Sequence, residues 1–470
     1  MGRVKTFVVC VAAAVSAVLI WGPSWVVPEG SSPEMARSAQ RTLAIFVLCT
    51  SLWFTNYIPL AATGLLAIVL LPVLGVMPAK QSFALFGNQA VFFMLGVFLL
   101  AAAMIATGLS KRLTLLFLQR FDRTPRQLVT GILLTSAFLA LLMPEHAVAA
   151  MIFPILVEIV ETLKLEKRKS EYAKTLFLAL AWGSIIGGVG TFLGGARAPL
   201  AMGMLAEYSG ERISFIDWMM AAAPIVLIML GVGGWMLRFS FDCDVDSIQP
   251  ATQMLDDRVR RLGPMSGPEL RLAILGVLTV ICWVFFGHTV GLAVIAVFSA
   301  TLLFILRIAD WRQVQDYVNW GVLIMYGGAI ALGTALNETR AIDWVLRTAW
   351  GGLDAGVSTL LILGVMATIA IVMTEGISNS AAVAILVPLG YSLCEAANVD
   401  AVTMTLAVTI PAGLAFSFPI SSPPNAICFS AGYYGVRDVV RRGVFMSLAS
   451  LGVVLLTMWL YWPMLGLGVD

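Results

Sequence analysis

Long apolar runs separated by short polar segments fill most of this 470-residue chain. A helix needs about 20 apolar residues to cross the hydrocarbon core of a membrane. Eleven runs of that kind predict transmembrane helices near residues 7–27, 42–59, 61–79, 91–109, 173–205, 217–237, 272–287, 289–306, 318–336, 402–432 and 444–465. Two further apolar stretches, 127–163 and 357–396, are too long for one span, and each is broken in its middle. The pattern predicts an all-α integral membrane protein.

Loop charges predict how the two broken stretches enter the membrane. The segments before and after 127–163 are rich in basic residues, namely Lys111, Arg112, Arg120, Arg123, Arg126, Lys164, Lys167, Arg168, Lys169 and Lys174. Because positive loops stay in the cytoplasm, this stretch should enter and leave from inside. The flanks of 357–396, "GGLDAG" and "CEAANVD", contain no Lys or Arg, which predicts entry and exit from outside. The remaining loops predict a cytoplasmic N-terminus and an external C-terminus.

The middle of each stretch predicts a re-entrant helical hairpin. The first turns at Pro144-Glu145-His146 and the second at "TEGISNSAA". Two ordinary spans joined outside would also leave both flanks of the first stretch on one side. The broken, polar tip favours a hairpin buried in protein, since irregular backbone is tolerated at membrane depth only there or beside water.

A weak internal repeat predicts two inverted halves. The segment "PEHAVAAMIFP" (144–154) aligns without gaps on "SNSAAVAILVP" (378–388). Downstream of each lies a segment dense in Gly and Pro, "GGVGTFLGGARAPLA" and "FSFPISSPPNAI", which should unwind a helix. Inverted repeats with broken helices are typical of secondary transporters. The predicted parts are an N-terminal span with an outer loop (1–41), a first repeat (42–240), a cytoplasmic linker (241–271) and a second repeat (272–470).

Composition agrees with membrane insertion and narrows the function. The chain is 60% hydrophobic and 12% charged, whereas soluble domains carry about 25% charged residues. A net charge of +2 gives no sign of nucleic-acid binding. The six scattered cysteines lack metal-ligand spacing, and two histidines, His146 and His288, exclude a poly-His metal site. The N-terminus resembles a signal peptide, but its apolar run continues to Val27, which favours an uncleaved span.

Three segments carry a resemblance to a known family. "GISNSAAVAILVPL" resembles the Ser-Asn-Thr hairpin tip of the divalent anion:sodium symporters, solute carrier family 13 in its bacterial forms. "SFPISSPPNAICFSAGYY" resembles that family's second broken helix, and "FGNQAVFFMLGVFLLAAAMIATGLSKRL" resembles the helix before its first hairpin. The resemblance implies eleven spans plus two hairpins and a homodimer in the bilayer of the inner membrane. It also implies elevator-type transport of dicarboxylates, tricarboxylates or sulfate with sodium, and no other cofactor.

The resemblance assigns binding roles around the second hairpin. It implies that the substrate is bound by Ser378, Asn379, Ser380, Ser422, Pro423, Pro424 and Asn425. It implies a sodium site, the second of the family's two, at Thr374, Ser378, Asn379 and Ser421. Taken alone, the Ser and Asn residues of the tip are also good helix N-caps. Glu375, beside the tip, is either a pore-side carboxylate or a solvated end residue.

The first half departs from the family pattern. Pro144-Glu145-His146 stands where a second Ser-Asn-Thr is expected, and Gly195-Ala196-Arg197-Ala198 stands where Thr-Pro-Pro-Asn is expected. Unpaired charges at membrane depth are costly, and the two positions converge in the family's fold, so we expect Glu145 and Arg197 to pair and replace one sodium. His146 either joins them or caps the tip. Alternatively, Glu145 and His146 face a cytoplasmic water cavity, and Arg197 binds the anion directly, which is compatible with pairing.

Other classes of function compete with secondary anion transport. A membrane-embedded enzyme would need a constellation such as His-Glu-x-x-His or Gly-x-Ser-x-Gly, and neither occurs in the sequence. A cation:proton antiporter would use Glu145 and His146 as proton carriers. A proton-coupled or anion-exchange transporter also fits the residues, so the sequence leaves the coupling open.

Overall fold

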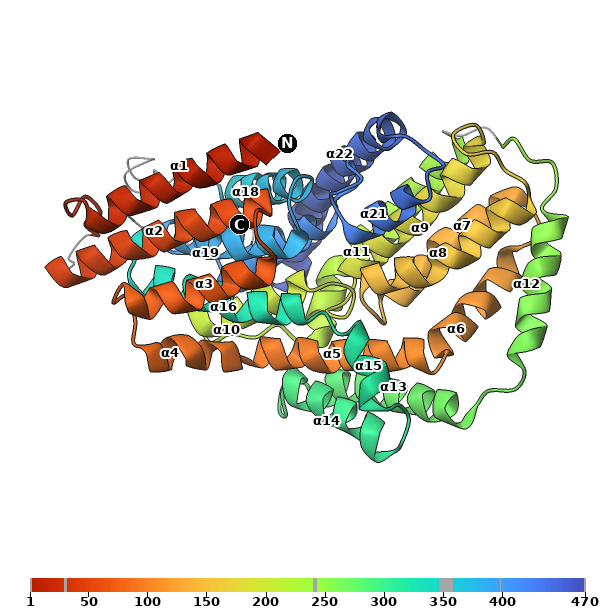
Figure 1. Cartoon of the computed structure of the whole chain (residues 1–470), viewed down its shortest axis with the longest axis horizontal. Coiled ribbons are helices and arrows are strands. Elements are labelled where there is room, and N and C mark those ends of the chain that lie inside the picture. Colours follow the sequence, from red (N-terminus) through yellow and green to blue (C-terminus); the bar gives the residue numbers. More distant parts are fainter. Residues whose placement is uncertain are drawn as a thin grey trace.

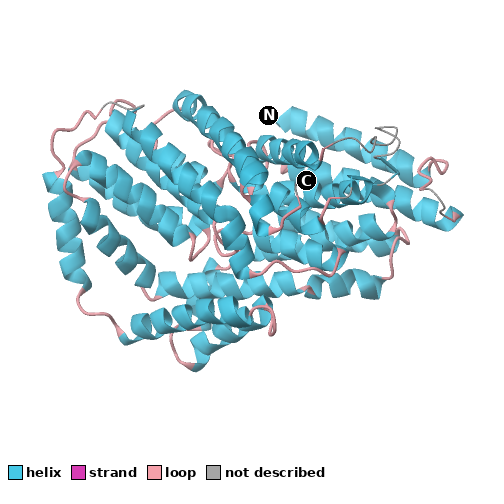
Figure 2. Cartoon of the chain, turned by 180° about the vertical axis from the view of Figure 1, so that it is seen from behind, coloured by secondary structure: helices cyan, strands magenta, loops and turns pink. Residues whose placement is uncertain are grey.

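The computed structural model describes residues 2–28, 32–239, 243–342, 344–345, 358–397 and 399–468. All regular secondary structure in these residues is helical (Figure 2). The helices before the linker are α1 (Gly2–Trp21), α2 (Pro33–Thr55), α3 (Leu60–Val73), α4 (Ala79–Ala84), α5 (Gln89–Ala106), α6 (Leu109–Leu118), α7 (Pro125–Ala140), α8 (Glu145–Thr162), α9 (Glu171–Val189), α10 (Arg197–Tyr208) and α11 (Phe215–Phe239). The later helices are α12 (Gln249–Leu262), α13 (Gly267–Phe286), α14 (Leu292–Ile305), α15 (Trp311–Val314), α16 (Trp320–Glu338), α18 (Thr359–Thr374), α19 (Asn379–Ala397), α20 (Ala401–Thr409), α21 (Pro423–Ser430) and α22 (Val436–Leu460). Single 3₁₀ turns are η1 (Leu85–Gly87), η2 (Gln119–Phe121), η3 (Gln315–Tyr317), η4 (Pro411–Gly413) and η5 (Trp462–Leu465).

Each apolar run predicted from the sequence coincides with a helix or with a pair of helices. Within the described residues, seven helices are long and apolar enough to cross a membrane. Some boundaries differ: α1 ends at Trp21, before the predicted end at residue 27, and α2 begins at Pro33, inside the outer loop predicted to reach residue 41. The Ser32 hydroxyl caps this helix by accepting from the Met35 N–H, and the buried Gln40 amide binds backbone carbonyls at the end of α1. These polar contacts extend α2 beyond its apolar core.

Two of the predicted runs are divided by unwound backbone. The first break, residues 190–196, separates α9 from α10. The second break, residues 414–422, follows α20 and η4 and precedes α21. Gly-rich sequence ends α9, while Pro423 begins α21, where its missing N–H is not needed. Both breaks fall in the Gly- and Pro-rich segments that predicted them.

Each break is preceded in the sequence by two helices joined through a tight turn. α7 and α8 are joined at residues 141–144 and form the first hairpin; α18 and α19 are joined at 375–378 and form the second hairpin (Figure 1). The predicted outer flank of the second hairpin, residues 351–356, lies outside the described residues. The helix beyond each break packs in the other half: α21 contacts α8 and α9, and α10 contacts α19 and α20.

The predicted cytoplasmic linker contains a helix, α12, which the pattern of long apolar runs does not predict. α12 lies along one edge of the molecule and packs against α6 and α8 (Figure 1). It buries Ala251 and Leu255 on one face. On its polar face, Arg258 forms an ion pair with Glu158 of α8, and Asp256 accepts a 2.7 Å hydrogen bond from the Gln119 amide. The linker therefore contains a helix that packs against the first half, rather than only a loop.

Candidate functional site

The tip of the first hairpin is tied to the first break through its backbone. Pro144 precedes α8, and the Glu145 N–H, which lacks a partner inside the helix, donates to the Gly194 carbonyl at 2.8 Å. The Thr191 hydroxyl donates to the Leu141 carbonyl at 2.8 Å. These contacts satisfy polar groups at buried helix ends, which would otherwise be costly. They hold the Glu145 side chain toward the start of α10.

Arg197, the first residue of α10, meets Glu145 inside the protein. Its side chain is 2% exposed, and its Nη1 lies 3.4 Å from the Glu145 Oε2. Its Nη2 donates to the Gly188 carbonyl at 2.8 Å, while its Nε has no hydrogen-bond partner among the described residues. The expected contact is present, although it is a single contact rather than a bidentate one, because the second nitrogen binds the end of α9.

Glycines leave the space that this pair occupies. A Cβ on Gly188 would lie 2.4 Å from the Glu145 Oε2, and a Cβ on Gly413 would lie 2.4 Å from the Arg197 Cζ. Real Cβ atoms do not approach other atoms so closely. Gly188 closes α9 before the first break, whereas Gly413 belongs to η4 before the second. The guanidinium is therefore enclosed between the ends of both broken helices.

His146 faces a different neighbour. Its ring meets the Phe98 ring of α5 edge-on, with 6.5 Å between the ring centroids. None of the hydrogen bonds found among the described residues joins His146 to Glu145 or Arg197. The tip thus presents its acidic residue to the first break and its histidine to α5.

The second hairpin tip combines a helix cap with an unsatisfied buried oxygen. The Ser378 hydroxyl accepts from the Ala381 N–H at 3.2 Å, which is the N-cap contact, and Ser378 is otherwise exposed. Asn379 and Ser380 are 8% and 9% exposed. The Asn379 Oδ1 is buried and has no hydrogen-bond partner within the described part of the chain. Such an oxygen is suited to receive a cation, because buried acceptors are rarely left unpaired.

The residues that begin α21 are held mainly by each other. The Ser422 hydroxyl accepts from the Asn425 N–H at 3.4 Å, and Pro423 and Pro424 fill the first turn. The Asn425 amide donates to the Ala415 carbonyl at 3.1 Å and to the Ser421 hydroxyl at 3.0 Å. Among the described residues no hydrogen bond joins this group directly to the Ser378–Ser380 tip. The second hairpin contacts η4, which precedes the second break, whereas α21 packs against α8 and α9.

Glu375, whose role the sequence left open, binds the second break. Its carboxylate accepts from the Phe416 N–H at 3.1 Å, the Ser417 N–H at 2.9 Å and the Ser417 hydroxyl at 2.8 Å. The Ser447 hydroxyl of α22 donates to it at 2.5 Å. Thr374, just before it, is fully buried and donates to the Ala370 carbonyl of its own helix. The one sequence signal for a role of Glu375 is its position directly before the hairpin tip.

Comparison with known proteins now adds the family. Residues 9–468 match the family described as the sodium:sulfate symporter transmembrane region. This chain belongs to that family. Two proteins named sodium-dependent dicarboxylate transporter SdcS, from Staphylococcus saprophyticus and Staphylococcus aureus, are each 29% identical to it over 454 residues. The alignments cover 91% of this chain and 87% and 86% of the two relatives.

A solved transporter shares the fold of this sodium:sulfate symporter family member. The crystal structure of the Alcanivorax borkumensis YdaH transporter aligns with a TM-score of 0.50 at 15% identity, covering 81% of this chain and 88% of that one. The predicted membership of the divalent anion:sodium symporters is confirmed by the family match. Like its relatives, the chain is a membrane transporter and not an enzyme.

Proposed function

We propose that this protein carries a small divalent anion (a dicarboxylate, a tricarboxylate or sulfate) across the inner membrane together with sodium, and that the Glu145–Arg197 pair replaces one of two sodium sites. The observation that carries the proposal is the buried guanidinium between the two broken helices. Arg197 supplies there a permanent positive charge of the kind that a bound sodium would supply. Glu145 offsets its charge, which lowers the penalty of burying it.

The second hairpin provides the remaining sodium site in this proposal. Among the described residues the Asn379 Oδ1 has no donor, and the Thr374 and Ser421 hydroxyls direct their own hydrogens to backbone carbonyls. The Ser421 hydroxyl also accepts from the Asn425 amide, which leaves it one lone pair. Hard cations such as sodium prefer oxygen ligands of this kind. Ser378, at the start of α19, completes the set.

The anion binds between the tips, in this proposal, at the N-terminal ends of α19 and α21. The backbone N–H groups and dipole at a helix start favour negative charge. Ser378, Asn379 and Ser380 lie at the start of α19, and Ser422 through Asn425 lie at the start of α21. Their hydroxyls and amides suit carboxylate and sulfate oxygens alike. Arg197, whose Nε has no hydrogen-bond partner among the described residues, strengthens the positive potential of this region.

Inverted repeats and elevator-type movement in a homodimer form the framework of the proposal. The packing supports the repeats, because exchanging α7, α8, α9, α10 and α11 for α18, α19, α20, α21 and α22 maps most of the helix contacts among them onto one another. α8 with α9 matches α19 with α20, and α21 with α8 matches α10 with α19. A cysteine in place of exposed Lys167 should resist an impermeant thiol reagent added outside, whereas one in place of exposed His288 should react. The opposite pattern would reject the orientation.

Uptake into proteoliposomes tests the function. Radiolabelled succinate and sulfate are offered with an inward sodium gradient, with equal potassium, and with a proton gradient alone. We expect uptake of at least one anion to require the sodium gradient. Sodium-independent uptake that depends on a counter-anion would establish exchange instead. Uptake driven by protons alone would transfer the coupling to Glu145 and His146, and cation:proton exchange without anion movement would reject anion transport.

A further inference from the structure

A cavity in the first half lies away from both hairpin tips. It has a volume of about 510 Å³ and is lined by α7, α9, α11 and η2. Its floor contains buried Leu133, Tyr172 and Leu237. The loop charges predict the cytoplasmic side for this end of α7, α9 and α11. The cavity therefore belongs to the membrane boundary rather than to the transport site.

Three arginines at the rim give the cavity a positive charge. Arg120, Arg126 and Arg238 line it, and none of its lining residues is Asp or Glu. Some arginines elsewhere on this side have acidic partners, as Arg112 has Glu269 and Arg258 has Glu158. Within the described residues, no ion pair involves the three rim arginines. The positive end of the α7 helix dipole adds to the positive potential.

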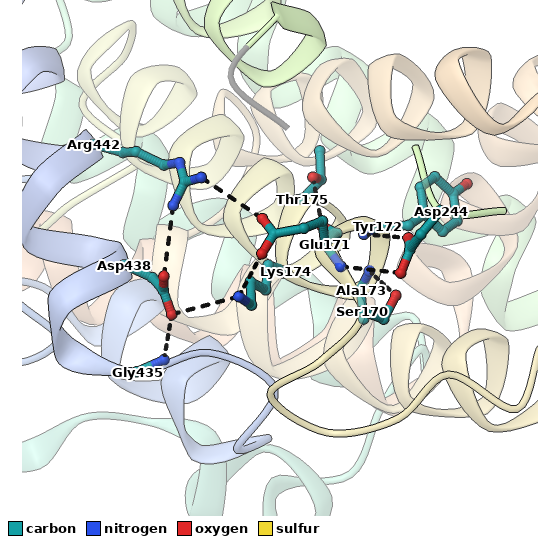
Figure 3. Close-up of polar contacts among 10 residues, drawn as sticks. All are labelled: Ser170, Glu171, Tyr172, Ala173, Lys174, Thr175, Asp244, Gly435, Asp438 and Arg442. Carbon is teal, nitrogen blue, oxygen red and sulfur yellow. Dashed lines mark hydrogen bonds and ion pairs between the residues drawn. The ribbon is translucent and has the colours of Figure 1, made fainter. Parts of the chain in front are cut away.

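Two acidic residues beside the cavity, Asp244 and Glu171, have other partners. Asp244 accepts from the Glu171 N–H at 3.2 Å and from the Tyr172 N–H at 2.9 Å, so it caps α9 (Figure 3). Glu171 lies 2.6 Å from the Lys174 Nζ and 3.6 Å from the Arg442 Nη2 (Figure 3). Neither carboxylate forms an ion pair with a rim arginine among the described residues, so the three guanidiniums remain able to bind an external anion.

Apolar helix faces continue from the cavity toward the membrane interior. On α7, Thr130 lines the cavity, and Leu134 and Phe138, one and two turns further, are 38% and 37% exposed. On α11, Arg238 and Gly234 line the cavity, and Leu227 on the same side is 69% exposed. A ligand that reaches the three arginines thus has an apolar surface beside it, running in the direction of acyl chains.

We propose that this cavity binds the phosphate headgroup of an anionic phospholipid of the cytoplasmic leaflet. Arginine guanidiniums bind phosphate oxygens in pairs of hydrogen bonds. Basic pockets between transmembrane helices on the cytoplasmic side are suited to such headgroups. The acyl chains lie along the exposed faces of α7 and α11. The charge of the rim and the adjoining apolar faces together select a lipid rather than a soluble anion.

Native mass spectrometry of the purified full-length protein in neutral detergent tests the proposal. The probes are phosphatidylglycerol, phosphatidylcholine with the same chains, and glycerol 3-phosphate. We expect the protein to retain phosphatidylglycerol and to lose the other two under the same conditions. Changing Arg120, Arg126 and Arg238 together to Gln should weaken phosphatidylglycerol binding about a hundredfold, since each basic residue near an anionic headgroup contributes roughly a fivefold factor.

A matched triple variant controls for the loss of charge. Arg123, Arg260 and Arg437 are exposed basic residues that do not line this cavity, and their change to Gln should leave binding within about twofold of wild type. If the rim triple variant cannot be purified, Arg126→Gln alone should weaken binding about fivefold. Equal weakening in both triple variants would overturn the proposal. Retention of glycerol 3-phosphate as tightly as of the lipid would also overturn it, by showing a soluble-anion site.

Discussion

The two hairpin tips hold the breaks beside them with different chemistry. In the first half, the Glu145 carboxylate meets the Arg197 guanidinium just beyond the first break. In the second half, the Glu375 carboxylate accepts from the Phe416 and Ser417 N–H groups inside the second break. Both halves thus place a carboxylate at the tip, but the first adds a permanent cation. The second keeps a buried oxygen of Asn379 that has no donor in the described part of the chain.

This difference implies that the stability of the two tips depends on bound ions to different degrees. A tip closed by an ion pair within the protein needs no bound metal to hold its break. A tip that retains an unpaired buried oxygen is stabilised when a cation arrives, because the oxygen then gains the partner it lacks. In the proposed function, the first half is therefore held in every step of the cycle, and the second half responds to sodium.

Breaking the pair in the first half should give the largest effect. Arg197→Ala and Glu145→Ala should each destabilise the protein by about 3–5 kcal/mol, because the surviving charge is left buried without its partner. The double variant should recover part of this loss, with a coupling free energy above about 1 kcal/mol. Reversible unfolding of the four proteins in mixed micelles measures the cycle.

The exposed pair Lys169–Glu166 provides the control cycle, since its atoms lie 2.5 Å apart in solvent. Its two substitutions should be additive, as solvent screens such contacts. Additive losses at Glu145 and Arg197 as well would reject a coupled buried pair.

Changing the second tip should affect transport more than folding. Asn379→Ala removes the unpaired buried oxygen, and losing a ligand to a charged group costs about 1.5–3 kcal/mol. Sodium-driven uptake should then fall below about a tenth of the wild-type rate, while thermal stability without sodium stays unchanged. Asn337→Ala, at an exposed asparagine of α16, is the matched control. Wild-type uptake by Asn379→Ala would remove the sodium site from this tip.

Neutralising the carboxylate of the second tip should have a smaller effect on stability. Glu375→Gln keeps the shape but exchanges charge-assisted hydrogen bonds for neutral ones, a difference of about 1 kcal/mol. The loss should be smaller than that of Glu145→Ala, because the described partners of Glu375 are neutral N–H and hydroxyl groups. Glu211→Gln, at an exposed glutamate, should have no measurable effect. A loss as large as that of Glu145→Ala would make the two tips equivalent.

The smallest predicted effect concerns the sodium dependence of the wild-type protein. With one sodium site in the second half, the Hill coefficient of uptake against sodium concentration should be about one, since it does not exceed the number of sites. Initial uptake rates measured over a range of sodium concentrations at fixed ionic strength give this value. A clearly steeper dependence would show that the Glu145–Arg197 pair does not replace a sodium site.

The sequence predicted those parts of the fold that depend on local signals. Apolar runs located the long helices, and Gly and Pro located the breaks at 190–196 and 414–422. The contact between Glu145 and Arg197 was predicted because two opposite charges at membrane depth must be offset. It needed the family resemblance as well, since 52 residues separate the two positions. The local hydrophobic pattern does not predict contacts between residues so far apart in the sequence.

Other contacts had weaker signals. α12 was missed because its sequence is polar, although Ala251 and Leu255 have the spacing of one helix face. The hydrogen bonds that Glu375 accepts from the Phe416 and Ser417 N–H groups join a hairpin tip to a break about 40 residues further along the chain. The identities of these residues do not predict that they are partners. The position of His146 against Phe98 follows from packing of the tip on α5, which periodicity does not describe.

The neutral ion pair at Arg197 has a consequence for the electrical character of transport. Fixed charges that cancel add nothing to the charge moved in a cycle, so the net charge is that of the cargo alone. Under the proposed function, a dianion entering with one sodium ion carries one negative charge inward. A membrane potential that is negative inside then opposes uptake by about 2.3 kcal/mol per 100 mV. Replacing a sodium ion by an arginine would thus make accumulation depend on voltage in the unfavourable direction, and hyperpolarised vesicles should take up less substrate.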